Sequence, residues 1–191
     1  MAIGTEISFI IEKVKQVMTK PSEFFEGIKS EEGIGPAFKY LAVIAIVPII
    51  PLFLLVSAGM SETSEFPFEF FAKASPILMT VIPIFSYVTT LLFSFIFAGV
   101  IQLSARLLKG SGNFATTYKA TIYAGTPSTL LSWIPVVGFI FGLWSLYLVI
   151  KGVSILHEVS MGRAVLIVVF LLLVIVVVAG DTGALFAFGM F

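Results

Sequence analysis

The sequence contains no cysteine, only one histidine and few charged residues. Charged residues make up 12% of its 191 residues, against roughly 25% in a soluble domain, whereas 59% are hydrophobic and the mean hydropathy is +1.11. A water-soluble globule of this size could not bury so much apolar surface. The absence of cysteine excludes disulfides, thiolate zinc sites and cysteine nucleophiles from this chain. A net charge of zero gives no basic field for nucleic acid. We therefore expect an all-α, polytopic integral membrane protein that does not bind nucleic acid.

Motifs of catalysis and cofactor binding are also missing. The sequence has no HExxH, no G-x-S-x-G, no Walker loop and no dinucleotide-binding glycine pattern. Paired carboxylates at membrane depth, which an intramembrane hydrolase would need, are absent too. We expect no enzymatic activity, no catalytic or metal-binding residues and no cofactor.

Long apolar segments predict a bundle of five transmembrane helices, because a span needs about 20 mainly apolar residues. The predicted spans are residues 38–58, 76–103, 118–133, 136–156 and 163–179. Together they form a membrane domain over residues 37–180, preceded by a cytoplasmic segment, residues 1–36, and followed by a short outside tail, residues 181–191.

The distribution of basic residues predicts the orientation of these spans. With the N-terminus inside, all of the 11 Lys and Arg residues except Lys73 fall in cytoplasmic pieces. Cytoplasmic loops are enriched in positive charge. We expect a protein of the cell membrane with a cytoplasmic N-terminus and an outside C-terminus.

Two segments outside the spans have distinct patterns. Residues 1–20 carry apolar side chains at helical spacing, with Lys13 and Lys15 largely elsewhere around the helix, which predicts an amphipathic helix. This helix either lies in the cytoplasmic membrane interface or packs on the protein's own inner surface. The outer loop, residues 59–75, holds four phenylalanines and should lie against the bilayer; we assign no metal to its glutamates.

The third predicted span is polar and is interrupted by Gly125 and Pro127. Pro127 should leave a carbonyl near Tyr123 without its helical donor, and neighbouring hydroxyls could occupy it. The segment is either a kinked packing helix or a substrate site, since broken spans mark such sites in transporters. Lys119 and Lys151 are expected near the inner headgroups, where lysines snorkel.

Small residues recur in the second and fourth spans. Ser86, Thr90, Ser94 and Ala98 repeat every four residues, and Gly138 and Gly142 form a GxxxG pair. Such faces either pack helices closely or bind a partner. The short turn at residues 133–135 predicts antiparallel packing of the third and fourth spans. The candidate helix-packing or interaction positions are Tyr123, Pro127, Pro135, Gly138, Gly142, Lys151, Gly152 and His157, the last expected to be structural.

The stretch YAGTPSTLLSWIPVVGFIFGLWSLYLVIKGVSILHEVSMGRAV resembles the core of the Yip (Ypt/Rab-interacting protein) domain family. PSEFFEGIKSEEGIGPAFKYLAV resembles the lead-in to the first span of its prokaryotic members. The resemblance implies five spans, a cytoplasmic N-terminus and a C-terminus on the far side. Eukaryotic members are linked to Rab-type GTPases and to vesicle traffic. The sequence lacks their DLYGP motif, which argues against binding of a small GTPase and favours a prokaryotic plasma-membrane member.

The leading functional hypothesis is a non-enzymatic membrane scaffold or adaptor. Its expected partners are the lipid bilayer and either further copies of the chain or other membrane proteins. The alternative is a transporter or channel for a small solute or ion, built around the broken third span.

Overall fold

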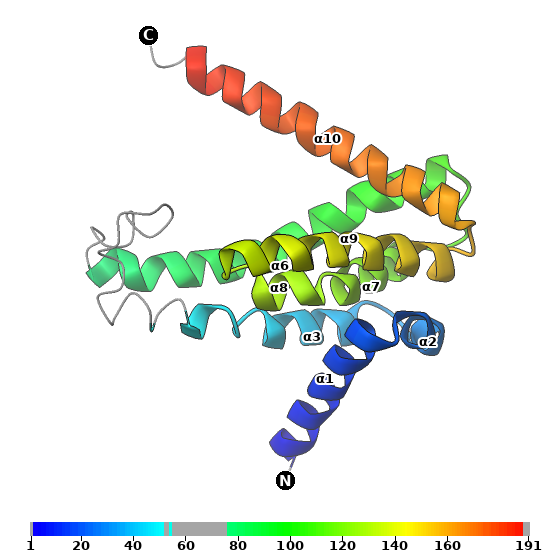
Figure 1. The fold of residues 1–191 in the computed structure, drawn as a ribbon, viewed down its shortest axis with the longest axis horizontal. Coiled ribbons are helices and arrows are strands. Elements are labelled where there is room, and N and C mark those ends of the chain that lie inside the picture. Colours follow the sequence, from blue (N-terminus) through cyan, green and yellow to red (C-terminus); the bar gives the residue numbers. More distant parts are fainter. Residues whose placement is uncertain (1, 52–53, 55–75, 189–191) are drawn as a thin grey trace.

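The structure, a computed structural model, describes residues 2–51, 54 and 76–188 (Figure 1), and every regular element within these ranges is helical. This confirms the all-α prediction for the described part of the chain. The elements are α1 (Ala2–Thr19), α2 (Pro21–Gly27), the 3-10 turn η1 (Ile28–Ser30), α3 (Gly35–Ile44), α6 (Pro76–Leu107), α7 (Phe114–Ala124), α8 (Thr126–Leu131), α9 (Pro135–Leu156) and α10 (Met161–Phe188).

Two helical segments are long and apolar enough to cross a membrane, Val81–Leu107 within α6 and Val136–Leu156 within α9. Two further apolar helical segments are shorter than these two. They are Gly35–Pro51, which begins with α3, and Met161–Val174, the first half of α10. Prolines lie at the first residue of α6 and α9, where a missing N–H costs no hydrogen bond. The remainder of the first predicted span and the phenylalanine-rich outer loop lie outside the described residues.

Two helices continue beyond the predicted ends of their membrane spans. α6 continues from residue 103 to Leu107, and α10 continues past residue 179 to Phe188. Residues 181–188 of the predicted tail are therefore helical and continue α10. Hydropathy falls along this stretch although the backbone remains helical, so an apolar-run criterion ends the helix too early.

The third predicted span is divided at Gly125 into α7 and α8. α7 begins at Phe114, earlier than predicted, because the Asn113 side chain accepts a hydrogen bond from the Thr116 N–H at 3.0 Å and caps the helix. The Thr126 hydroxyl donates to the Tyr123 carbonyl at 2.7 Å. This confirms that a hydroxyl satisfies the carbonyl left free beside Pro127.

α7 and α8 lie at the centre of the bundle (Figure 1), between α3 on one side and α6 and α9 on the other. α9 runs back along α7 and α8 after the short connection, which confirms the predicted antiparallel packing. The fully buried core side chains include Tyr118, Tyr123, Ile101 and Leu148. α1 and α10 leave the bundle at an angle on opposite sides.

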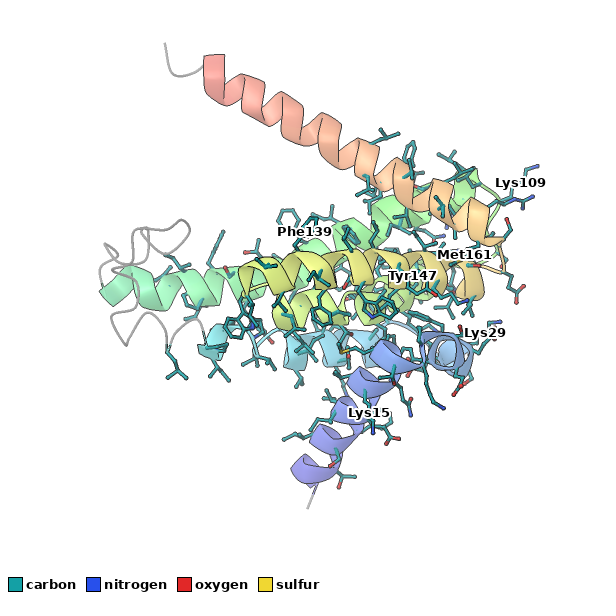
Figure 2. The ribbon with its side chains drawn as sticks, in the orientation of Figure 1. Lys15, Lys29, Lys109, Phe139, Tyr147 and Met161 are labelled. Atoms are coloured by element: carbon teal, nitrogen blue, oxygen red, sulfur yellow. The ribbon has the colours of Figure 1, made fainter. Side chains whose placement is uncertain are left out.

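Large apolar side chains are exposed along the outer surfaces of α6, α9 and α10, among them Phe85, Leu92, Phe139 and Leu173. An extended apolar surface of this kind marks a membrane or protein contact. Figure 2 places Lys29 and Lys109 at the end of the bundle where α9 ends and α10 begins, and Phe139 away from that end. These two lysines therefore lie at the same end of the bundle.

Candidate functional site

A buried ionic cluster fastens the N-terminal segment to the bundle. Lys13 on α1 is only 8% exposed, and its ammonium donates to the Glu31 carboxylate and to the Tyr123 hydroxyl, the latter at 2.9 Å. The Tyr123 hydroxyl in turn donates to the second oxygen of that carboxylate at 2.9 Å. The sequence pattern placed Lys13 on the polar side of its helix and did not predict its burial.

Lys119 adds a second lysine to this cluster. Its ammonium donates to the backbone carbonyls of Ile28, at 3.1 Å, and Glu31, at 2.5 Å, and the residue is 4% exposed. The prediction that Lys119 snorkels to the headgroups is therefore wrong. The connection from η1 to α3 passes over α7, and its free carbonyls take the place of lipid headgroups as acceptors.

Aromatic rings enclose Tyr123. The Phe24 and Tyr40 rings lie 5.1 and 5.0 Å from it, centroid to centroid, both edge to face. The Lys13 ammonium lies 4.8 Å from the Tyr123 ring centroid, within cation–π range. Tyr40 also shares a 2.8 Å hydrogen bond with Thr126. Tyr123 is thus contacted from α1, α2, α3 and the chain after η1.

A second cluster, around His157, joins the connection between α6 and α7 to the end of α9. The Gly112 N–H donates to His157 Nδ1 at 3.2 Å, so Nδ1 is unprotonated and Nε2 carries the hydrogen. Nε2 then donates to the Thr117 hydroxyl at 2.8 Å, and that hydroxyl donates to Gln102 Oε1. The Gln102 amide donates to the Gly112 carbonyl at 3.0 Å. The hydrogen-bonded chain begins and ends at Gly112.

This closed chain of hydrogen bonds holds His157 as a neutral, structural residue, in agreement with the sequence analysis. His157 is completely buried, and burial lowers the pKa of its imidazole. Its backbone carbonyl accepts hydrogen bonds from the Ser111 N–H, at 3.2 Å, and hydroxyl, at 2.9 Å. A Cβ on Gly112 would lie 2.7 Å from Nδ1, so only glycine fits there. The sequence analysis assigned no role to Gln102 or Thr117; the available signals were the four-residue series of the second span, which Gln102 continues, and the polar character of the segment that holds Thr117.

The candidate glycines differ in their surroundings. A Cβ on Gly152 would lie 2.8 Å from the Phe25 ring, which places α2 directly against α9. A Cβ on Gly138 would lie 2.9 Å from the Ser132 backbone, in the turn between α8 and α9. A Cβ on Gly142 would meet no atom within 4 Å. The prediction that Gly142 is a close-packing site within this chain is therefore wrong; its reading as a partner-binding position stays a prediction.

The remaining candidate positions lie apart from one another. Pro127 is buried in the first turn of α8, and Pro135 begins α9. Lys151 is half-buried near the other end of α9. The structure therefore brings Tyr123 together with the N-terminal segment, and it does not gather the predicted positions into one site.

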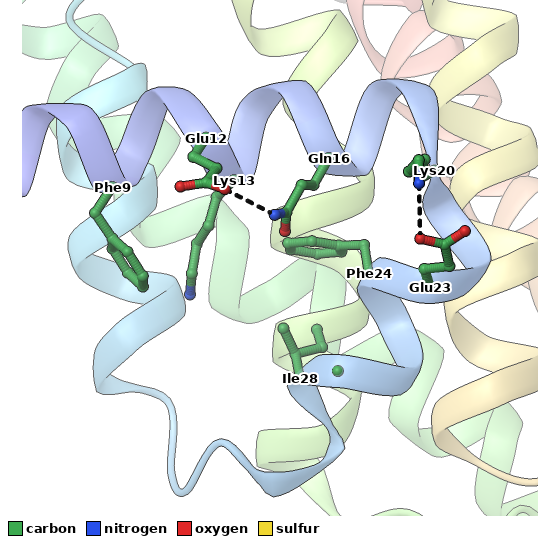
Figure 3. Close-up of a pocket in the computed structure, with 9 residues that line it drawn as sticks. Phe9, Glu12, Lys13, Gln16, Lys20, Glu23, Phe24 and Ile28 are labelled. Carbon is green, nitrogen blue, oxygen red and sulfur yellow. Dashed lines mark hydrogen bonds and ion pairs between the residues drawn. The ribbon is translucent and has the colours of Figure 1, made fainter.

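Two pockets border these clusters. One, of about 550 Å³, lies between α1 and α2 next to Lys13 (Figure 3). The other, of about 670 Å³, is mostly apolar and lies among α3, α6, α7, α8 and α10. Among the described residues, no three His, Asp or Glu side chains are grouped so that they could hold a metal ion.

Comparison with known proteins identifies one family. The model of the Yip1 domain matches residues 15–180, most of the chain. The search of curated proteins and the search of solved structures each found no match. The matched range includes Glu31, Lys119, Tyr123 and His157, and it begins two residues after Lys13.

Proposed function

The chain belongs to the Yip1 domain family, and on this premise we propose that it is a multi-pass membrane protein that acts as a non-enzymatic scaffold or adaptor. The apolar helices of the described residues support residence in a membrane. Five spans, a cytoplasmic N-terminus and an outside C-terminus in the cell membrane are part of the proposal. The segregation of Lys29 and Lys109 to one end of the bundle supports that orientation (Figure 2).

The observation that carries the scaffold proposal is the way α1 is held. Its C-terminal half is anchored by Lys13 and by the fully buried Val17. Toward its N-terminus α1 leaves the bundle (Figure 1), and apolar side chains along the helix stay uncovered, Ile7 being 50% and Ile11 61% exposed. An anchored helix with uncovered apolar side chains offers a fixed surface to a membrane or to a partner helix. Its proposed partners are the bilayer and a membrane protein, either a second copy or another chain.

The alternative, transport of a small solute or ion, draws on the apolar pocket of about 670 Å³, whose wall includes Thr90, Ser94 and Thr121. These hydroxyls already have partners within the protein. Thr90 donates to the Ser86 carbonyl at 2.8 Å, Thr121 to the Thr117 carbonyl at 2.9 Å, and Ser94 bonds with the Tyr118 hydroxyl at 3.0 Å. This pairing favours a packing role for the broken third segment.

Photo-crosslinking in cells tests the scaffold proposal. A photoreactive amino acid replaces Ile7 in one variant and Ser8 in the control, since adjacent residues lie about 100° apart around a helix. We expect the Ile7 probe to form a defined crosslink to a membrane protein, identified by mass spectrometry, and the Ser8 probe to form none. Absence of any protein crosslink from Ile7 would contradict the adaptor role.

A flux assay distinguishes transport from the scaffold role. Protein reconstituted in liposomes is screened against ions and small metabolites, and the scaffold proposal predicts no flux above that of protein-free vesicles. Saturable flux that disappears on changing Tyr123 or Pro127 would establish transport instead.

A further inference from the structure

The pocket between α1 and α2 has a cationic floor and apolar walls. Lys13 lies at the floor, and the rings of Phe9 and Phe24 with Ile28 form the walls. Figure 3 shows the Lys13 side chain extending between Phe9 and Phe24 into the space that the nine lining residues enclose. Its volume of about 550 Å³ lies within the range of small-molecule sites, roughly 300–1,000 Å³.

The floor carries more positive than negative charge. The side chains of Lys13 and Lys119 both bond to the Glu31 residue, one through its carboxylate and the other through its backbone carbonyl. The carboxylate of Glu31 pairs with Lys13 alone, while Lys119, which lies behind the pocket lining, adds a second ammonium bonded only to backbone carbonyls. Lys13 uses two of its three N–H donors on Glu31 and Tyr123, which leaves one for a ligand in the pocket.

The charges at the rim do not cancel this excess. Glu12 accepts a hydrogen bond from Gln16 at 3.2 Å, and Glu23 pairs with Lys20 at 3.2 Å. These groups are exposed, so water and salt screen them. The Lys13 side chain is only 10% exposed, and its charge acts through a medium of lower dielectric constant. An anion is therefore favoured over a cation inside the pocket.

We propose that this pocket binds a phosphate group that carries an apolar chain, with the head group of an anionic phospholipid as its source. The phosphate accepts a hydrogen bond from Lys13, and the apolar part lies against Phe9, Phe24 and Ile28. Basic pockets beside membrane helices bind lipid head groups in this way. The site goes beyond the scaffold role, because it concerns a ligand held between α1 and α2 rather than a membrane protein that contacts the uncovered side chains of Ile7 and Ile11.

Gly27 provides a variant that blocks the pocket and leaves Lys13 unchanged. Gly27 lines the pocket, its backbone is helical with φ −62°, and an added Cβ would meet no atom within 4 Å. Gly27→Leu should therefore fill the cavity without disturbing the fold. Two substitutions serve as matched controls: Gly4→Leu on α1, also in open space, and Lys15→Gln, a lysine on α1 that does not line the pocket.

The experiment is isothermal titration of the full chain, purified in a detergent without phosphate, with dihexanoyl-phosphatidylglycerol, inorganic phosphate and uncharged dihexanoylglycerol. We expect saturable binding of the phospholipid, weakened about tenfold or more in Gly27→Leu and unchanged in both controls. The melting temperature without ligand should be the same for all four proteins, which shows that they are folded.

Each other outcome counts against a defined part of the proposal. Inorganic phosphate binding as tightly as the phospholipid supports the phosphate site and overturns the lipid assignment. Equal binding of uncharged dihexanoylglycerol overturns the role of the phosphate. No binding of any probe, or equal binding by wild type and Gly27→Leu, overturns the site itself and leaves the crosslinking test of the scaffold role unaffected.

Discussion

The ammonium of Lys13 lies 2.9 Å from the phenolic oxygen of Tyr123, although 110 residues separate the two in the chain. Both groups also bond to the Glu31 carboxylate, so three segments of the sequence meet at one buried point. The N-terminal segment is consequently part of the packed structure, and α1 leaves the bundle from a fixed position.

Removing the Tyr123 hydroxyl tests this attachment. Tyr123→Phe deletes one donor and one acceptor in a buried network, and we expect a loss of about 1–3 kcal/mol in the free energy of unfolding. Thermal melting in detergent measures it, and limited proteolysis should show faster cleavage within α1. Tyr147→Phe is the control, because Tyr147 is 40% exposed and stacks on Trp144. Equal melting temperatures for the two variants would argue against the network.

Replacing a buried lysine should lower the stability of the protein much more than replacing an exposed one. Lys13→Met leaves the partly buried Glu31 carboxylate without its cation, and we expect a loss of about 3 kcal/mol, the lower end of the range for buried pairs. Lys20→Met breaks the exposed pair with Glu23 and should change stability little. Chemical denaturation of both variants makes the comparison. Similar small losses for the two would show that Lys13 is solvated.

The position of Lys13 also shows why sequence patterns predict only part of this site. Local chemistry predicts that helices start at Pro76 and Pro135 and that a helix breaks near Pro127. The structure contains both starts and the break. The burial of Lys13 depends on partners far along the chain, which no local pattern contains.

The two glycine examples make the same point for packing. Gly142 belongs to a GxxxG pair and faces open space, whereas Gly152 has no motif and meets the Phe25 ring. A small residue permits close contact, but the direction that its helix face points decides whether contact occurs. The hydrogen-bond network around His157 is a similar case, since Gln102 and Thr117 become neighbours only when α6 and α7 pack together.

Alanine substitution at these glycines is a direct test of their contacts. Gly152→Ala places a methyl group 2.8 Å from the Phe25 ring, and overpacking of this kind costs about 1–3 kcal/mol. Gly142→Ala meets no atom within 4 Å and should leave the melting temperature nearly unchanged. The opposite order of the two melting temperatures would contradict the packing of α2 against α9.

The stability of the protein should fall as the pH is lowered through the range in which histidine titrates. Burial lowers the pKa of His157 in the folded state, so below about pH 6.5 the unfolded state binds more protons than the folded state. The stabilisation is complete above that pH and is lost as the pH falls toward the folded-state pKa.

Because His157 is the only histidine, its replacement isolates the effect. Melting temperatures between pH 5 and 8 should decline on acidification in the wild type, and His157→Gln should show a flatter profile with lower stability at pH 8. A variant profile as steep as that of the wild type would assign the pH dependence to other groups.

The central claim is the proposal that the chain is a five-span membrane protein with a cytoplasmic N-terminus and an outside C-terminus. Cysteine labelling tests it most directly, because the chain contains no cysteine. Single cysteines at Ser30, Ser111 and Ser160 should react with a membrane-impermeant reagent only from the cytoplasm, and cysteines at Ser61 and Gly189 only from outside. Labelling of Gly189 from the same side as Ser30 would contradict the odd number of spans and the orientation derived from it.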